Sequence, residues 1–235
     1  MQPNVRRQYL HTLGIDWFVP RDEPAADEEA GGAVDAAEPP APAAAAPPAD
    51  WDEFRAAVSA CRACELGAGR RNAVFGVGDP AADWMIIGEA PGAEEDRRGE
   101  PFVGRAGQLL DAMLQSLSLD RSSVFIANIL KCRPPGNRDP RAEEIAACRR
   151  FLDRQIADIR PKLLLAVGRI AAQTLLNTTA PVGRLRGRVH RNDDLPVPLV
   201  VTYHPAYLLR SPEQKGKVWS DLVLAYRTMQ ELEPA

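Results

Sequence analysis

Four cysteines have the spacing that most directly suggests chemistry. Cys61 and Cys64 form a Cys-x-x-Cys pair, and Cys132 and Cys148, farther along the chain, are separated by 15 residues. Four thiolates can hold a zinc ion or an iron–sulfur cluster, and spacing alone does not distinguish the two. The alternatives are a redox pair at 61 and 64, or thiols buried against apolar neighbours. Disulfide bonds are not expected, because the N-terminus carries no export signal.

A glycine-rich acidic segment is the second candidate for chemistry. Gly88 and Glu89 open the sequence Gly-Glu-Ala-Pro-Gly, and Glu95 lies in the acidic run after it. The glycines allow close approach of the backbone to a ligand, and a carboxylate there can position water or act as a base. Phe102 follows in another glycine-rich loop, where a flat ring can stack on a ligand. The alternatives are a solvated turn and a loop aromatic that closes the core.

The segment Thr-Tyr-His-Pro-Ala-Tyr-Leu-Leu-Arg at 202–210 is the third candidate. His204, braced by the proline that follows it, can donate a hydrogen bond to a developing oxyanion. The apolar residues after it could fill a gap in a base stack, and Arg210 could meet a phosphate. A histidine in such a loop is also commonly structural or solvated.

Alternating strand and helix patterns must position these segments. Four short apolar runs have the length and composition of strands buried on both faces: 84–88, 124–128, 163–167 and 198–202. Helical patterns lie between and after them: 109–117, 145–156, 169–176 and 212–231. This alternation predicts an α/β fold with three layers, α/β/α, around a four-stranded, mainly parallel sheet.

The carboxyl ends of the predicted strands bring the candidate residues to one edge of the sheet. Gly88, Asn128, Gly168 and His204 each fall at or just after the end of a predicted strand. Ligands of open parallel sheets bind at this edge, so we expect the site there.

Composition divides the 235-residue chain into three regions. Residues 1–19 are a short apolar segment that can form a helix, and residues 20–50 are an acidic linker rich in Ala and Pro that we expect to be disordered. Residues 51–235 are the predicted catalytic domain. The net charge of −3 divides into −6 for residues 1–50 and +3 for the rest, which permits nucleic-acid binding. We expect no membrane span and a cytoplasmic protein.

Together the motifs resemble those of the family 4 uracil-DNA glycosylases, the iron–sulfur branch of the uracil-DNA glycosylase superfamily. The resemblance covers roughly residues 51–230 and rests on the order and spacing of several segments: Cys61-x-x-Cys64, Gly-Glu-Ala-Pro-Gly at 88–92, Pro-Phe-Val-Gly at 101–104, Asn-Ile-Leu-Lys-Cys-Arg-Pro-Pro at 128–135, Cys148 and His-Pro-Ala-Tyr-Leu-Leu at 204–209. It implies a 4Fe–4S cluster on the four cysteines and an enzyme that flips uracil out of DNA and hydrolyses its N-glycosidic bond. The resulting abasic site initiates base excision repair.

The resemblance also implies roles for individual residues. Phe102 stacks on the extruded base, and Asn128 reads its edge, although a strand-end amide can instead cap backbone groups. His204 stabilises negative charge on uracil O2. Glu89 and Glu95 place the attacking water or shape the substrate pocket beside Gly88, and Glu95 alternatively excludes the methyl group of thymine.

The resemblance and the positions of basic residues also suggest contacts with DNA. Leu208 is the expected wedge that enters the duplex, with Tyr207 or Leu209 as alternatives. Lys131 and Arg133, beside a cluster cysteine, are expected to face phosphate. The basic stretch around His190 is expected to be a loop that contacts DNA or is solvated, and it contains Arg184, Arg186, Arg188 and Arg191.

Other functions and partners remain open from the residues alone. One alternative is a non-catalytic nucleic-acid binding module stapled by zinc or a cluster, and another is a small-molecule hydrolase on the same sheet. Residues 8–18 are a candidate for docking to a replication or repair protein, or for a short helix packed on the domain. We expect a monomer, because the sequence shows no repeat or coiled-coil pattern.

Overall fold

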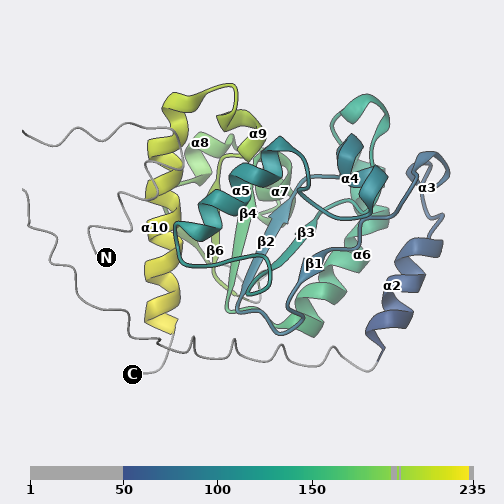
Figure 1. The fold of residues 1–235 in the computed structure, drawn as a ribbon, viewed down its shortest axis with the longest axis horizontal. Helices are drawn as coiled ribbons and strands as arrows, with labels where there is room; N and C mark the ends of the chain where they lie inside the picture. The colour runs from purple at the N-terminus through teal and green to yellow at the C-terminus, as the bar shows by residue number, and fades with distance from the viewer. Residues whose placement is uncertain (1–49, 192–194, 196, 233–235) are drawn as a thin grey trace, which may run out of the picture.

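A mixed sheet of six strands lies at the centre of the described part of the molecule, in the order β1-β3-β2-β4-β6-β5 (Figure 1). The structure is a computed structural model that describes residues 50–191, 195 and 197–232. The central strands are mutually parallel: β3 (Phe125–Asn128), β2 (Trp84–Gly88), β4 (Leu163–Val167) and β6 (Leu199–Thr202). These are the strands that the sequence predicted, and the α/β class is confirmed.

The sheet is wider than predicted, because a short antiparallel strand closes each edge. β1 (Val77–Gly78) pairs with β3, and β5 (Val189–His190) pairs with β6. The prediction of a four-stranded sheet is therefore right for the parallel core and wrong for the whole. Two-residue strands leave no readable apolar run, which is why the sequence did not reveal them.

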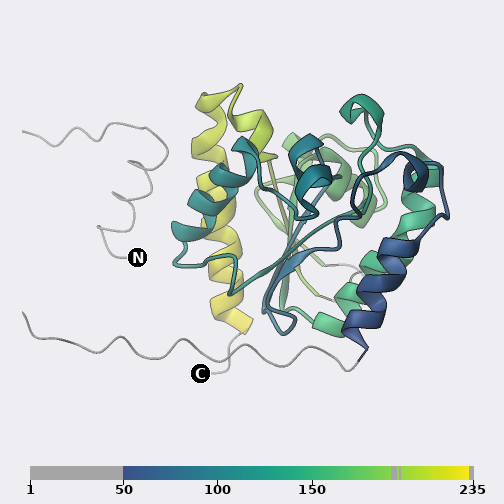
Figure 2. The same cartoon turned by 45° about the vertical axis from the view of Figure 1, so that its right-hand side comes forward.

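Helices cover both faces of the sheet. One face packs in a single apolar cluster against α2 (Trp51–Ala60), α3 (Leu66–Gly69), α6 (Ala142–Ile159), α7 (Arg169–Leu175) and α8 (Val182–Leu185). The other face packs against α5 (Arg105–Gln115), α9 (Pro205–Leu208) and α10 (Lys215–Leu232). Figure 2 shows the sheet between these layers, with α2 and α6 at the right and α5 and α10 at the left. The short elements α4 (Ala93–Arg98), η1 (Pro135–Asn137) and η2 (Pro212–Gln214) complete the described chain.

An aromatic cluster attaches α2 to the sheet. Trp51, Phe54 and Val58 are the buried residues of this helix, at helical spacing. The Trp51 ring lies edge-on to Phe75 and Phe125, with ring centroids 5.2 and 5.8 Å apart. Such pairs each contribute about 0.5–1.5 kcal/mol beyond their buried area. Because α2 ends directly before Cys61, this packing also fixes where the Cys-x-x-Cys pair begins.

The register of the parallel strands aligns their carboxyl ends. Gly88 lies opposite Asn128 across β2 and β3, and Val167 lies opposite Thr202 across β4 and β6. The loops that leave these strands therefore begin side by side. The predicted segment 1–19 and nearly all of the linker at 20–50 lie outside the described residues, so these remain predictions. None of the described helices has both the length and the apolar character needed to cross a bilayer.

Candidate active site

A cavity of about 650 Å³ opens where the parallel strands end. The predicted catalytic and base-binding side chains all line it, and they come from the segment between β2 and α5, the end of β3 and the loop after β6: Glu89, Glu95, Phe102, Asn128 and His204. The prediction that strand ends assemble the site agrees with this arrangement. The cysteines lie elsewhere, around a separate small cavity.

The absence of a side chain at Gly88 leaves room for the side chains of Asn128 and Phe102 in the main cavity. A Cβ at position 88 would lie 2.4 Å from Oδ1 of Asn128 and 2.6 Å from Cζ of Phe102, so only glycine fits. Asn128 is 2% exposed, and its Oδ1 has no hydrogen-bond partner among the described residues. A buried acceptor without a donor costs about 1–3 kcal/mol. The amide is thus poised to accept from a ligand rather than to cap the backbone.

Phe102 presents its ring from a constrained loop. Its backbone lies in the left-handed region, with φ of 54°, and its side chain is buried. The ring stacks near His204, with centroids 5.5 Å apart and 27° between the planes. A non-glycine residue keeps a positive φ only where the surrounding structure enforces it. Two charged side chains, described next, hold this loop.

Glu95 holds the part of the loop that follows Phe102 in the chain. Its Oε1 accepts from the backbone N–H groups of Val103 and Gly104 at 3.0 and 3.2 Å, and its Oε2 accepts from Gly92 at 3.1 Å. A carboxylate with three backbone donors is occupied in organising two loops. This geometry favours a pocket-shaping role for Glu95 over placement of water.

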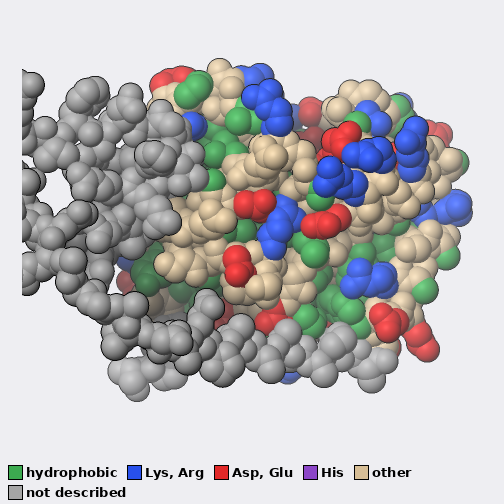
Figure 3. All heavy atoms as spheres, in the orientation of Figure 1, with side chains coloured by type: hydrophobic (Ala, Val, Ile, Leu, Met, Phe, Trp, Pro, Cys, Tyr) green, Lys and Arg blue, Asp and Glu red, His purple; other side chains and the backbone are tan. Residues whose placement is uncertain are grey.

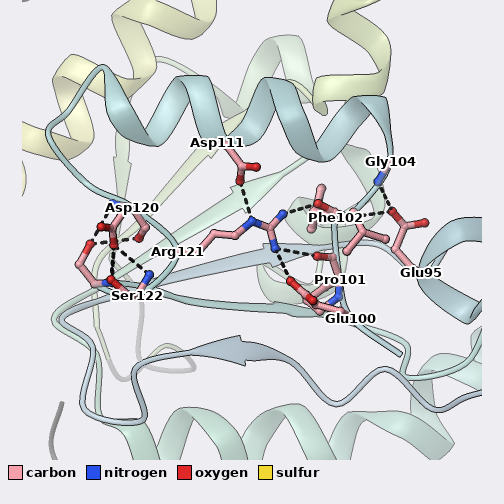
Figure 4. A network of polar contacts seen from close by, with 11 residues as sticks. Glu95, Glu100, Pro101, Phe102, Gly104, Asp111, Asp120, Arg121 and Ser122 are labelled. Carbon is pink, nitrogen blue, oxygen red and sulfur yellow. Dashed lines mark hydrogen bonds and ion pairs between the residues drawn. The ribbon is translucent and has the colours of Figure 1, made fainter. Parts of the chain in front are cut away.

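Arg121, in the segment between α5 and β3, holds the loop at Phe102 and the residue before it (Figure 4). Its guanidinium donates to the carbonyl oxygens of Pro101, at 3.0 Å, and Phe102. It also pairs with Glu100 at 3.1 Å and with Asp111 at 2.7 Å. Sequence reasoning missed Arg121, because its partners lie 10 to 21 residues away and no local pattern marks such a contact.

His204 is held as a neutral donor. Its Nδ1 accepts from the backbone N–H of Ala206 at 3.1 Å, so a neutral ring carries its proton on Nε2. Burial, assisted by the positive charge of Arg210, lowers the pKa of His204 to about 4, while Glu95 acts in the opposite direction. Gly168, with φ of 99°, lets β4 end against this histidine, because a Cβ there would lie 3.0 Å from the Cβ of His204.

Glu89 lines the cavity and has a raised carboxyl pKa. Burial raises its pKa, and the negative charge of Asp139 raises it further, whereas Arg169 lowers it. Its backbone carbonyl accepts from Leu130 at 3.0 Å, which ties the loop after β2 to the loop after β3. A partly buried carboxylate of raised basicity suits proton acceptance from water.

The predicted wedge at Leu208 is wrong. Leu208 is 1% exposed and packs in the core between the sheet, α5 and α10, because α9 turns it inward. Leu209, the next residue, is 40% exposed. The alternative that the sequence left open at 209 therefore has the exposure that a wedge needs.

Two predicted DNA contacts are also corrected. Lys131 is 1% exposed, and its Nζ donates to the Asn128 carbonyl at 3.0 Å and to Gln155 Oε1 at 2.6 Å, so it does not face phosphate. Burial lowers the pKa of Lys131 to about 8, and the nearby Cys148 acts in the opposite direction. Arg186 forms a two-bond ion pair with Asp221, at 2.8 and 2.9 Å, and Asp221 is fully buried.

The remaining arginines of the basic stretch lie at the surface: Arg184, Arg188 and Arg191. Around the cavity mouth, Arg210 is exposed, Arg138 pairs with Glu144 and Arg169 pairs with Asp139. On the face seen in Figure 3, Lys and Arg side chains gather mainly in the upper half. Positive side chains thus accompany the end of the sheet at which the cavity opens.

All four cysteines line one small cavity beside α2, α3 and α6, and none forms a disulfide. Arg70 donates to Cys132 Sγ at 2.8 Å, and the backbone N–H of Lys131 lies 3.3 Å from Cys148 Sγ. Burial raises the pKa of Cys132 and raises that of Cys148 to about 11, and a bound metal centre would favour their thiolate forms. Within the described ranges, no three Cys, His or carboxylate side chains converge on a single metal-ion position.

Comparison with known proteins identifies the family. The family model described as the uracil DNA glycosylase superfamily matches residues 75–223. A type-4 uracil-DNA glycosylase of Archaeoglobus fulgidus is 42% identical over 72% of this chain and 88% of its own length. Those of Pyrobaculum aerophilum and Sulfurisphaera tokodaii are 40% and 42% identical, over 75% and 68% of this chain and 93% and 76% of their own lengths. The chain therefore belongs to the uracil-DNA glycosylase superfamily and, within it, to the type-4 uracil-DNA glycosylases.

Proposed function

We propose that the cavity binds uracil flipped out of DNA, and that the chain hydrolyses the N-glycosidic bond of that nucleotide to leave an abasic site. The observation that carries this proposal is the orphaned Oδ1 of Asn128, a buried acceptor beside the ring of Phe102. Uracil offers a donor at N3–H and an acceptor at O4, which suits an amide oxygen and an amide nitrogen. Cytosine presents the opposite pattern at these positions and leaves buried polar groups unpaired, which such sites reject by up to about 10⁴–10⁵.

His204 is the residue that receives the developing charge. As the bond from N1 to C1′ breaks, its electron pair passes to the base, and negative charge gathers on uracil O2. The Nε2–H of a neutral His204 donates to that oxygen, while Ala206 holds the ring through Nδ1. Preorganised donors of this kind are worth about 2.7–4 kcal/mol in other enzymes.

Glu89 completes the hydrolysis. Its carboxylate orients a water molecule and accepts a proton from it as the water oxygen bonds to C1′. The raised pKa of Glu89 makes it a better proton acceptor than an exposed glutamate. Glu95 acts as a positioning residue, because its oxygens hold the loops that carry Glu89 and Phe102.

DNA binding uses the surface around the cavity. Extrusion of a base costs a few kcal/mol, and we assign the compensating wedge to Leu209, whose exposure suits insertion into the stack. Arg210 and the surface arginines of the basic stretch are suited to phosphate contacts. We also propose that residues 51–235 act as the catalytic domain and as a monomer, since one cavity collects every predicted catalytic side chain.

The four cysteines are the proposed ligands of a 4Fe–4S cluster. Their shared cavity supports this, as do the donors directed at sulfur from Arg70 and the backbone of Lys131. The chemistry that such a cluster supplies here is cross-linking of the Cys-x-x-Cys segment to the loop after β3 and to α6. Iron and acid-labile sulfide in purified protein, both lost in Cys148→Ser, are the expected result. Zinc in their place would overturn the assignment.

The base-reading proposal is tested with 3-methyluracil in an oligonucleotide. A methyl group at N3 removes the donor that Asn128 Oδ1 is proposed to accept, so we expect excision of uracil and at least a hundredfold slower excision of 3-methyluracil. The matched control is Asn128→Ala, in which the low residual rates for the two bases should converge. Equal excision of both bases by the unmodified protein would overturn the proposal.

A further inference from the structure

Lys131 is a buried cation that has no part in the chemical steps proposed above. It lies in the loop that leaves β3, and it is among the largest fully buried side chains of the described protein. Its Nζ donates to the carbonyl oxygen of Asn128 at 3.0 Å and to Oε1 of Gln155 at 2.6 Å. Gln155, itself fully buried on α6, donates in turn to the carbonyl of Phe75 at 2.8 Å.

Both partners of this ammonium are neutral. Removal of an ammonium ion from water costs several kcal/mol even after relaxation, and buried charges are normally paired or bound to metal centres. None of the ion pairs in the described ranges includes Lys131. The charge therefore calls for an anion close to its position.

The cavity of the cysteines is where that anion fits. Its lining includes the four cysteines, Arg70 and Lys131, and no carboxylate among the described residues. The four thiolates carry more negative charge than the iron–sulfur core carries positive charge, so a thiolate-bound cluster is a net anion. Arg70 reaches Cys132 Sγ directly at 2.8 Å, and Lys131, which is fully buried, interacts electrostatically with Cys148.

We propose that Lys131 is the buried counter-ion of the iron–sulfur cluster and that it links the cluster to the base-reading end of β3 through the Asn128 carbonyl. The inference rests on the proposed cluster. The potential of a cluster depends on the net charge and hydrogen bonds around it, and outer-shell partners typically alter metal affinity by 10–100-fold. Lys131 thus favours the reduced cluster and its retention, and it acts as a positioning residue for Asn128.

Two substitutions separate charge from packing. Lys131→Met keeps much of the side-chain volume and removes the cation. Gln155→Glu keeps the lysine and sets a carboxylate against its Nζ, so the pair becomes neutral with little change in shape, although the donor to the Phe75 carbonyl is lost as well. The matched control is Lys162→Met, which removes a surface cation paired with Asp83. The readouts are the midpoint potential of the cluster and the rate of iron release to a chelator.

We expect both substitutions to lower the midpoint potential and to speed iron release by roughly tenfold or more, while Lys162→Met matches the unmodified protein. If Lys131→Met fails to fold, Gln155→Glu alone decides the matter. If the variants that fold leave the midpoint potential and the iron release unchanged, the counter-ion role of Lys131 is overturned. The assignment of the cluster is not affected by that result. Unmodified protein without iron and sulfide would overturn the cluster and the counter-ion together.

Discussion

The backbone N–H of Ala206 donates to Nδ1 of His204 at 3.1 Å, and this one bond determines what the histidine can do. With Nδ1 occupied as an acceptor, the neutral ring has its proton on Nε2 and is a hydrogen-bond donor there. The N-terminal turn of α9 and the close approach of Gly168 hold the ring in place. A donor fixed before the substrate arrives needs no reorganisation when charge develops.

His204 should remain neutral across the pH range in which an exposed histidine titrates. Because burial lowers its pKa from 6.5 to about 4, it gains a proton only as the pH falls towards that value. The unfolded chain binds more protons than the folded protein in this window, so stability should decline as the pH falls through it. Nitrogen-15 NMR should find Nε2 protonated and Nδ1 unprotonated at pH 7. Titration of this ring near 6.5 would contradict the account.

Gly88→Ala should abolish most activity without unfolding the protein. The new methyl group would meet Asn128 Oδ1 and Phe102 Cζ at 2.4 and 2.6 Å, so both side chains must shift. A displacement of about 1 Å can cost about 10²-fold in rate, and we expect at least that loss in kcat/KM. Gly216→Ala is the control, because nothing lies within 4 Å of a Cβ there. Full activity in Gly88→Ala would mean that these contacts do not define the base site.

Arg121→Gln should weaken catalysis through the position of Phe102. The substitution removes donors from the carbonyls of Pro101 and Phe102. Hydrogen bonds to charged groups contribute about 1.5–3 kcal/mol, so kcat/KM should fall about 10–100-fold, and excess uracil should inhibit less strongly. Arg97→Gln removes an exposed pair with Glu94 and should change neither quantity. Unchanged kinetics and inhibition in Arg121→Gln would show that the loop does not need this clamp.

Adjacent leucines should behave in opposite ways. Leu208→Ala should cost about 2–5 kcal/mol of unfolding free energy, because it empties a core position. Leu209→Ala should leave stability unchanged and slow excision from duplex DNA more than from single strands, since only a duplex needs a wedge. Chemical unfolding and excision assays on both substrates decide this. A duplex-specific defect in Leu208→Ala alone would restore the position that the sequence suggested.

The parallel core was readable from sequence for a physical reason. Strands covered by helices on both faces are apolar throughout, so β2, β3, β4 and β6 appear as short unbroken runs. Parallel strands then place Gly88, Asn128 and His204 at a common edge. The edge strands β1 and β5 are too short to produce a pattern.

The residues that sequence reasoning misplaced depend on contacts distant in the chain. Lysines are rarely buried, so nothing local indicated that Lys131 turns inward to Gln155, 24 residues away. Arg186 in the basic stretch is likewise held by Asp221 on α10. The choice between Leu208 and Leu209 rests on the rotation of a four-residue helix, which is too short to show a period.

Release of free uracil from a uracil-containing oligonucleotide tests the central claim most directly, with the unmodified protein beside His204→Ala and Asn128→Asp. The account predicts turnover by the unmodified protein and a loss of about a hundredfold or more in His204→Ala, which corresponds to a lost oxyanion donor. It also predicts that Asn128→Asp loses activity on uracil and gains activity on cytosine. No release of uracil by protein that contains its cluster would contradict the account and would favour a DNA-binding module.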